Sequence, residues 1–301
     1  MLKEELWMRL NTVHALSIET WTSIESHFSH NVSNNLAQNS EILSMSGLNP
    51  LQIKQFFEID SDLVNKTLKW LETSKRYILP ISSHNYPSNL KNIDRPPNLL
   101  FVEGDVALLH APQLVIVGSR RATHYGQFWA NKFACELSKL GFVITSGLAR
   151  GIDQTVHQSL LRVKGKTIAV LGSGLNDIYP SEHTALADKI VEHGGTLVSP
   201  FYPDTKQTIH HFSAKNHLMS ALGNGILVIE ATLKSGSLMT ARFALEQGKD
   251  IFALPGPLGN KQSQGTHWLI KQGANLASDP QDILEHIQSN FNWLNTDNPE
   301  R

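Results

Sequence analysis

The stretch "LVIVGSRRATHYG", Leu114–Gly126, decides the fold. Its first half is an apolar run rich in β-branched residues, as expected of a strand that helices cover on both faces of a sheet. The run ends at Gly118, and a helix-like pattern follows. Neither the Gly-Lys-Ser/Thr of a P-loop nor the spaced glycines of a dinucleotide fingerprint is present. Arg120 and Arg121 occupy the turn instead, which favours a phosphate ligand of another kind.

Five further strand-like segments follow, separated by amphipathic helical patterns of about 10–15 residues. Strands that alternate with helices predict right-handed βαβ units around a parallel sheet. This α/β region is therefore expected to be a doubly wound, Rossmann-like parallel sheet. The segments are "FVITSG" (142–147), "TIAVLGSG" (167–174), "GTLVSP" (195–200), "GILVIEA" (225–231) and "DIFALPG" (250–256).

Residues 1–74 are expected to form a small all-helical, separate domain. Leu6, Leu10 and Val13 recur at helical spacing, and Gly47 is the only glycine. The segment "ILSMSGLNPLQIKQFF" is typical of two helices joined by a turn, and whether such a pair touches DNA or only packs stays open. A proline-rich bridge, with one short strand in "NLLFVEG", then begins the α/β domain. That domain is expected over residues 75–290, and residues 291–301 are expected to be a frayed tail.

Composition excludes several classes of protein. With 301 residues, 41% of them apolar and 18% charged, the chain is typical of a globular protein of about two domains. Since its net charge is −1, a phosphate-binding surface must come from a local cluster of charge. The single cysteine, Cys135, excludes a disulfide framework and is expected to be a core thiol. No signal peptide or membrane span of roughly 20 apolar residues appears, so a cytoplasmic protein without a membrane partner is expected.

Four of the six expected strands lead into turns of small residues that can precede a helix. Glycine lets the backbone approach a ligand closely, and the free N–H groups of a helix start favour an anion. Because the carboxyl ends of parallel strands share one edge of a sheet, these turns predict a phosphate cradle there. They are Gly118-Ser119-Arg120, Ser146-Gly147-Leu148-Ala149-Arg150-Gly151, Gly172-Ser173-Gly174 and Ser235-Gly236-Ser237.

Familiar cofactor and catalytic motifs are missing. The segment "GSGLND" has Gly172 and Gly174, but Asp177 stands where the third glycine of a dinucleotide fingerprint would be, so no NAD and no other cofactor is expected. The lack of a P-loop excludes ATP hydrolysis by that mechanism. No G-x-S-x-G elbow and no local Ser–His–Asp motif appears, so no catalytic residue is assigned.

The segment "HHFSAKNH" gathers His210, His211 and His217. Without paired carboxylates or a His-x-x-x-His helix motif, no metal site is assigned to them. Together with Lys206 and Lys215 they outnumber the single acid of the segment, which favours a positive rim. An ordinary solvated surface is the alternative.

Five ordered blocks resemble one known family. They are "IVGSRRATHYG", "TSGLARGIDQTVH", "GSGLNDIYP", "FSAKNHLMSALGNGILVIEATLKSGSLMTA" and "ALPGPLGNKQSQGTHWLIKQGA". In this order they resemble the DNA-processing protein A family (DprA/Smf) over about Tyr77–Ala277, and the helical N-terminus looks like the SAM-like domain of many members. The resemblance implies a cytoplasmic homodimer that binds single-stranded DNA and loads the RecA recombinase on it during natural transformation. It implies no catalytic activity.

The resemblance also implies which residues form the phosphate pocket. A Gly-Ser-x-Arg turn and a basic Phe-Pro-x-Arg-Asn-Arg block line it in the family, and two small-residue turns close it. At matching positions stand Gly118, Ser119, Arg120, Phe212, Lys215, Asn216 and His217, closed by Ser146, Gly147, Leu148 and Ala149 and by Ser235, Gly236 and Ser237.

The basic block departs from the family pattern. Ser213 replaces its proline, and Lys215 and His217 replace its two arginines. Lysine keeps the charge but loses the bidentate fork, and histidine is mostly neutral near pH 7, so the strength and pH dependence of binding stay open. The family's C-terminal winged-helix domain is expected to be absent, because the chain ends soon after "DPQDILEHIQ".

The turn at Arg120 is thus expected to hold backbone phosphates of a polynucleotide without sequence preference. Phe212, Tyr179 and Tyr202 are the aromatic residues that hint at stacking platforms. For the dimer surface, the helix around "DPQDILEHIQ" offers apolar positions, and packing against its own domain is the alternative. Those positions are Ile283, Ile287 and Phe291.

A different class of protein is the alternative. Nucleoside-monophosphate phosphoribohydrolases share a related α/β fold with glycine-rich turns and carry a Pro-Gly-Gly-x-Gly-Thr-x-x-Glu block. The corresponding segment here, "EATLKSGSLMTARFALE" (230–246), lacks the Gly-Gly-x-Gly-Thr core of that block.

Overall fold

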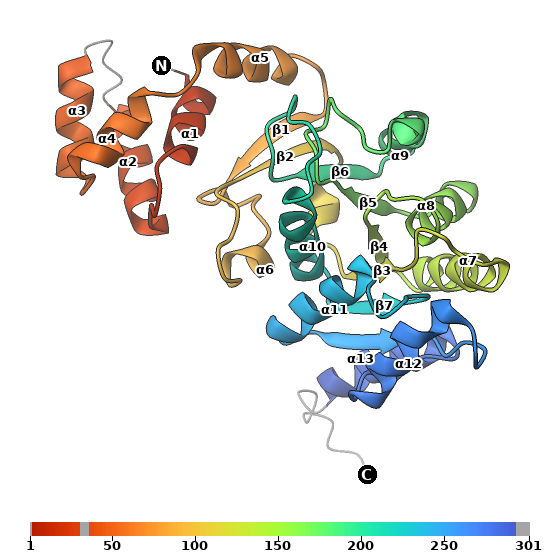
Figure 1. Cartoon of the computed structure of the whole chain (residues 1–301). Coiled ribbons are helices and arrows are strands. Elements are labelled where there is room, and N and C mark those ends of the chain that lie inside the picture. Colours follow the sequence, from red (N-terminus) through yellow and green to blue (C-terminus); the bar gives the residue numbers. More distant parts are fainter. Residues whose placement is uncertain (1, 31–35, 293–301) are drawn as a thin grey trace, which may run out of the picture.

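A computed structural model describes residues 2–30 and 36–292. Helices alone form the N-terminal part, and a nine-stranded sheet with helices on both faces forms the rest (Figure 1). The N-terminal helices lie at one end of the sheet and α12 and α13 at the other (Figure 1). No helix in the described ranges is long and apolar enough to cross a membrane.

The N-terminal helices pack around buried Met8, Trp21 and Phe56. The turn predicted at Gly47 is present, since this residue has φ +98° between two helices. Asn49 accepts from the backbone of Gln52 in a capping box, which starts the next helix at a proline. The expected helical domain is confirmed, with α1 (Lys3–Asn11), α2 (Ile18–His30), α3 (Leu36–Met45), α4 (Pro50–Phe57) and α5 (Ser61–Leu71).

The sheet has the order β1-β2-β6-β5-β4-β3-β7-β8-β9. All six expected strands are present, and β3 to β8 pair in parallel, which confirms the doubly wound fold. The strands are β1 (Arg76–Pro80), β2 (Leu99–Gly104), β3 (Gln113–Val117), β4 (Val143–Ser146), β5 (Thr167–Val170), β6 (Thr196–Ser199), β7 (Gly225–Val228), β8 (Asp250–Ala253) and β9 (Asn275–Leu276). The bridge adds β1 and β2, which extend the sheet antiparallel beyond β6.

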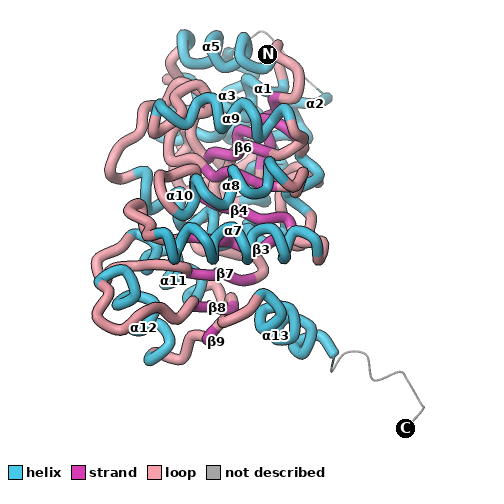
Figure 2. The backbone as a smooth tube through the Cα atoms, turned by 90° about the vertical axis from the view of Figure 1, so that its right-hand side faces the viewer, coloured by secondary structure: helices cyan, strands magenta, loops and turns pink. Residues whose placement is uncertain are grey.

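Side chains of β3 alternate between two cores. Leu114 and Ile116 pack in the cluster that contains residues of α7 and α8, whereas Val115 and Val117 belong to the cluster on the opposite face with α10. Figures 1 and 2 show α7, α8 and α9 on one side of the sheet and α10 and α11 on the other. The helices of this domain are α6 (Ser88–Lys91), α7 (His124–Lys139), α8 (Ile152–Arg162), α9 (Thr184–Glu192), α10 (His211–Leu222), α11 (Gly236–Glu246), α12 (Gln264–Lys271) and α13 (Pro280–Asn292), with short 3₁₀ turns at Val106–His110, Ser181–His183 and Lys261–Ser263.

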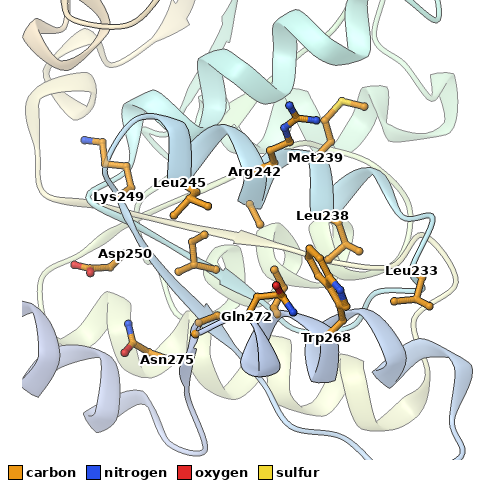
Figure 3. A pocket seen from close by; sticks show the side chains of 15 residues that line it. Leu233, Leu238, Met239, Arg242, Leu245, Lys249, Asp250, Trp268, Gln272 and Asn275 are labelled. Atoms are coloured by element: carbon orange, nitrogen blue, oxygen red, sulfur yellow. The ribbon is translucent and has the colours of Figure 1, made fainter.

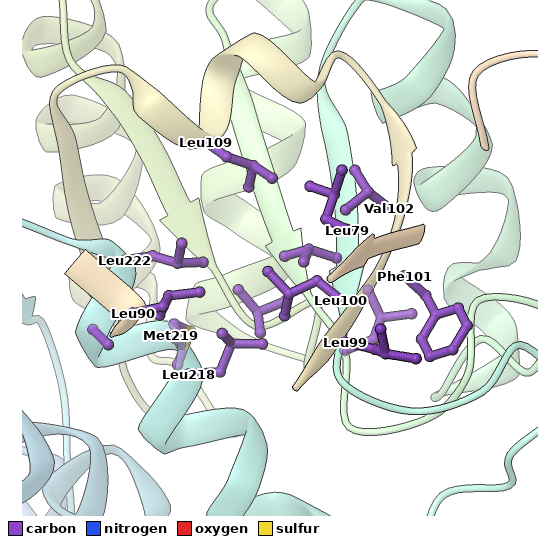
Figure 4. Packing of buried hydrophobic residues seen from close by; sticks show 14 of the residues in the cluster. Leu79, Leu90, Leu99, Leu100, Phe101, Val102, Leu109, Leu218, Met219 and Leu222 are labelled. Carbon is purple, nitrogen blue, oxygen red and sulfur yellow. The ribbon is translucent and has the colours of Figure 1, made fainter. Parts of the chain in front are cut away.

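Helix α10 is fixed by its apolar face. Leu218 and Leu222 lie beside Leu90 and belong to the same buried cluster as Leu99 and Leu100 of β2 (Figure 4). Complete burial of each such side chain contributes about 1.5–3 kcal/mol relative to exposure. The N-terminal half of α10 thereby lies at the carboxyl ends of the central strands.

Cys135 is only partly buried, contrary to the expectation of a core thiol. It lies on α7 with its sulfur 3.9 Å from the carbonyl oxygen of Ser159 on α8. Partial burial raises the pKa of this thiol, which favours its protonated form.

Candidate nucleic-acid interface

The chain switches direction between β3 and β7, since β4, β5 and β6 follow on one side of β3 and β7, β8 and β9 on the other. A cavity of about 530 Å³ lies at the carboxyl ends of these strands, where open α/β sheets bind ligands. Three of the four predicted turns reach it, together with α10. The predicted residues that line it are Gly118, Ser119, Arg120, Ala149, Phe212, Lys215, Asn216, Ser235, Gly236 and Ser237.

Packing requires glycine in the β3 turn and at the residue before α8. A Cβ on Gly118 would come within 2.5 Å of Ile152 on α8. Gly151 has φ +79°, and a Cβ there would lie 2.3 Å from the carbonyl oxygen of Ser119. The start of α8 therefore packs directly on the turn, and Ser119 Oγ accepts from the Arg121 N–H at 3.0 Å, which shapes the turn further.

A carboxylate, not a ligand, occupies the N-terminus of α7. Glu230, buried at the end of β7, accepts from the Thr123 backbone N–H at 2.9 Å and from its hydroxyl at 2.5 Å. A negative charge at a helix N-terminus is favoured by the exposed N–H groups there. The β3 turn thus directs Arg120 away from the helix start that Rossmann folds commonly use for phosphate. Sequence reasoning missed Glu230, although an acid at the end of an apolar strand was a signal for it.

Arg120 is exposed, and no carboxylate in the described residues forms an ion pair with it. Its guanidinium lies over the Phe212 ring, 4.7 Å from the ring centroid. Stacking on an aromatic face orients the guanidinium while its N–H donors remain directed outward. Arg120 is therefore a preoriented, unpaired cation at the mouth of the cavity.

Lys215 is buried at 7% exposure, and its ammonium donates to the carbonyl oxygen of Gly147. Burial lowers the pKa of Lys215 to about 8, opposed by the nearby Asp153 carboxylate. Burial likewise raises the pKa of Asp153, opposed mainly by the charge of Lys215. A Cβ on Gly147 would lie 2.7 Å from Asp153 and 2.8 Å from Lys215, so only glycine permits this arrangement. The pair compensates itself, and the net positive charge of the cavity comes from elsewhere.

The loop after β4 is held from several sides. Leu148 is buried with φ +59°, and its carbonyl oxygen accepts from His183 at 2.8 Å. Ala149 donates its N–H to Asp153 at 3.2 Å, and Ser146 donates its hydroxyl to a carbonyl of β3. Of this predicted block, Ala149 faces the cavity, while Ser146 and Leu148 support the loop from within.

At α11, the predicted turn leaves open space. Ser235 caps the helix by accepting from the Ser237 N–H at 3.3 Å, and nothing lies within 4 Å of a Cβ placed on Gly236. Free N–H groups at the start of an 11-residue helix favour an anion. Lys234 and Thr232, which sequence reasoning missed, line the cavity beside this turn. Their signal was their position directly before the small-residue turn.

Seven predicted residues do not line the cavity. Ser146, Gly147, Leu148 and Gly151 belong to the end of β4 and to the loop after it, which borders the cavity, whereas Gly172, Gly174 and His217 lie elsewhere. A Cβ on Gly174 would lie 2.1 Å from the carbonyl oxygens of Tyr202 and Pro203. The segment that begins at Tyr202 therefore covers the turn after β5. A Cβ on Gly172 would lie 3.0 Å from the side chain of Gln207, which belongs to the same segment. His217 lies on another side of α10 and packs edge-on against a phenylalanine of α11, and burial lowers its pKa. Among the described residues, no group of three His, Cys, Asp or Glu side chains is arranged to hold a metal ion.

Not all of the aromatic residues expected to stack with bases lie at the site. An adjoining cavity of about 310 Å³ shares Arg120, Phe212 and Lys215 with the first and adds Tyr179, which is exposed. Tyr202 faces elsewhere: its hydroxyl contacts Met8 and Asn11 of α1, and its ring packs on a phenylalanine of β2. Tyr202 joins the two parts of the chain instead of offering a stacking surface.

A larger groove of about 780 Å³ lies between α11 and α12 and has a different character (Figure 3). Leu233, Leu245 and Trp268 are exposed on it, which is typical of a protein-contact surface and not of a phosphate site. The alternative candidate for self-association, α13, packs on its own domain, because Ile283 is buried and Ile287 belongs to the same core cluster. The side chain of Phe291 lies outside the described residues.

Two family models and a bacterial relative match this chain. The model of DNA recombination-mediator protein A matches residues 77–288, and the SMF/DprA SAM domain model matches residues 1–69. Protein Smf of Escherichia coli is 42% identical over 306 residues, spanning 100% of this chain and 79% of that protein.

Two solved structures share the fold. The X-ray structure of DNA processing protein A from Streptococcus pneumoniae matches with a TM-score of 0.75 and 33% identity, covering 95% of this chain and 98% of that one. DNA processing protein A from Helicobacter pylori, whose structure is described as giving insight into its single-stranded DNA binding mode, matches with a TM-score of 0.65 and 31% identity over 72% and 97% of the two chains. The chain belongs to the DNA recombination-mediator protein A family, as its five ordered sequence blocks predicted.

Proposed function

We propose that this protein is a non-catalytic mediator of DNA recombination that binds single-stranded DNA and loads a RecA-type recombinase on it during natural transformation. The observation that supports it most is Arg120, an unpaired guanidinium held over Phe212 at the carboxyl ends of the central strands. A guanidinium binds phosphate oxygens in a bidentate manner and carries no information about the base.

The surrounding groups extend such a contact. The free N–H groups at Gly236 and the ammonium of Lys234 are directed to the same cavity, and Lys215 lies at its base. The exposed ring of Tyr179, beside the adjoining cavity, is available to stack with a base. Most of these groups recognise phosphate or a π-face, so binding is expected to be insensitive to sequence.

The hydrolase alternative is less well supported. Cleavage of a glycosidic bond requires a free carboxylate near the sugar. In the described part of the chain, Asp153 is the only acid that lines the main cavity, and it is engaged with Lys215 and the Ala149 N–H. Incubation with AMP followed by chromatography tests this alternative, and release of adenine at enzymatic rates would favour it.

The proposal includes a homodimer and a cytoplasmic location, both implied by the family resemblance. The apolar groove at Leu233, Leu245 and Trp268 is the surface that we propose for protein contacts, with a second copy or with the recombinase. Sedimentation of the full chain tests the dimer. Trp268→Ala is expected to shift it toward the monomer.

The decisive experiment is a titration with single- and double-stranded oligonucleotides at several salt concentrations. Tighter binding of single strands, equal for different sequences and weakened by salt, is expected. The slope of log affinity against log salt measures the number of phosphate contacts, at about 0.7 for each contact with a single strand. Absence of salt-dependent binding to single strands would overturn the proposal.

A further inference from the structure

A second, polar groove of about 580 Å³ runs between α7 and α8. Arg120 and Arg121 line both this groove and the main cavity, so the two adjoin at these side chains. Figure 2 shows α7 and α8 side by side on the face of the sheet opposite α10 and α11. A ligand that leaves the cavity past Arg121 enters this groove directly.

The groove carries uncompensated positive charge. Arg121 and Arg162 are exposed, and neither forms an ion pair in the described ranges. Glu182 is the only acid that lines the groove there, and it is already bound by Arg150 through two hydrogen bonds of 2.6 and 2.7 Å. An anionic ligand is therefore attracted along its length.

The remaining lining groups suit a nucleic-acid strand. Gln127 of α7 and Gln154 and Gln158 of α8 make no side-chain hydrogen bond within the described residues, which leaves amide donors and acceptors free on both walls. Phe128 is 62% exposed and is the only large apolar side chain among the described lining residues. A protein interface needs an apolar centre, whereas a single strand needs cations and an aromatic face.

We infer that single-stranded DNA continues from the main cavity into the α7–α8 groove, where Arg162 binds a backbone phosphate and Phe128 offers a stacking surface. This inference rests on the proposed function. The 11 residues of α8 span roughly 16 Å at about 1.5 Å per residue. At a rise of ~3.4 Å per stacked nucleotide, the groove accommodates up to about five further nucleotides.

Titration of the full chain with two oligo-dT lengths tests the inference. One length fills only the main cavity, and the other is longer by about five nucleotides. The longer oligonucleotide is expected to show a steeper salt slope. Arg162→Ala is expected to reduce that slope by about 0.7, and to leave the shorter oligonucleotide unaffected. The matched control Lys271→Ala removes one exposed charge on α12 and is expected to change neither titration.

Phe128→Ala provides a second measurement that does not depend on charge. Loss of one stacked base is expected to weaken binding of the longer oligonucleotide by between about five- and 150-fold, again without effect on the shorter one. Thermal unfolding of each variant verifies that the fold is retained.

Three results would overturn the inference. The variants could leave the longer oligonucleotide unaffected, as a groove for a protein partner would, or weaken both lengths equally. A duplex of the longer sequence could show the same slope change on Arg162→Ala, which would assign the groove to double strands. Failure of the proposed function itself looks different, because the wild-type chain would then not bind the shorter oligonucleotide at all.

Discussion

The turns after β3 and β5 are similar in sequence and different in environment. Both contain Gly-Ser, in Gly118-Ser119-Arg120 and Gly172-Ser173-Gly174. The first opens into the main cavity, whereas Tyr202 and Pro203 cover the second. Glycine in such a turn indicates only that a Cβ would meet a neighbouring atom, which is the Ile152 side chain at Gly118 and two backbone carbonyl oxygens at Gly174. Whether the turn also faces a cavity depends on the segment opposite.

The largest expected effect breaks the covered turn. Gly174→Ala places a Cβ about 2.1 Å from two carbonyl oxygens that cannot move independently. Such overpacking is expected to lower the free energy of unfolding by about 3 kcal/mol, measured by urea denaturation. Gly236→Ala is the matched control in the open turn, and nothing lies within 4 Å of its added Cβ. Equal stability of the two variants would contradict the comparison.

At the open turn, a substitution is expected to weaken DNA binding and to leave stability unchanged. Arg120→Ala removes an unpaired guanidinium from the cavity mouth and is expected to weaken single-strand binding by about 2 kcal/mol at every sequence, with unfolding unchanged. Anisotropy titrations of several oligonucleotides measure this, with Lys271→Ala as control. Unaltered affinity would remove Arg120 from the site.

The pH dependence of DNA binding tests the role of Lys215 in the basic block. Lys215 lies at the base of the cavity beside Asp153, and burial lowers its pKa to about 8. Above that pH the lysine loses its proton and leaves the Asp153 carboxylate uncompensated beside the proposed phosphate site, so the affinity for single-stranded DNA is expected to fall as the pH rises. The expected loss is about 1.5 kcal/mol, the size of one interaction with a charged group. DNA titrations between about pH 7 and pH 9.5 span the pKa of Lys215 and measure this decline. Lys215→Arg keeps its charge over that range and is expected to abolish the decline.

The histidine alternative predicts a different profile. If His217 bordered DNA, affinity would rise as pH falls through about 6.5. Its ring lies against α11, outside both cavities, and its pKa is lowered by burial, so a flat profile between neutral and mildly acidic pH is expected. A rise in that range, lost in His217→Ala, would place this side chain at the DNA.

The smallest effect concerns the segment that covers the second turn. Tyr202→Phe removes a hydroxyl that contacts Met8 and Asn11 and is expected to cost about 1 kcal/mol of stability without altering DNA affinity. Tyr179→Ala, at the exposed ring, is expected to do the reverse. Weaker DNA binding by Tyr202→Phe would show that this residue reaches the strand after all.

Much of the architecture was predictable because it depends on local patterns. The apolar run ending at Gly118 and its five successors identified every strand from β3 to β8. Helical spacing identified the N-terminal region as helical, without separating its five helices. The edge strands β1 and β9 were missed, because short strands at a sheet edge carry little alternation or apolar excess.

The site was predictable only in part. Arg120, Phe212 and Lys215 were identified by type and resemblance, and they do line one cavity. Glu230 and Asp153 were missed. The partner of Glu230 is Thr123, which lies 107 residues away in the sequence. Asp153 is a buried carboxylate beside Lys215, and no local sequence pattern reveals that contact. The inclusion of Gly172 and Gly174 in the cradle followed from their type alone.

By itself, the sequence determined the succession of strands and helices along the chain, the family, and the residue types that recognise phosphate. These follow from hydrophobic periodicity and from side-chain chemistry, which are properties of neighbours along the chain. Only the tertiary structure decided which small-residue turns stay open, that Glu230 occupies the start of α7, and that Arg121 and Arg162 border one continuous groove. Those outcomes depend on contacts between distant segments, whose free energy depends on three-dimensional packing and not on local pattern.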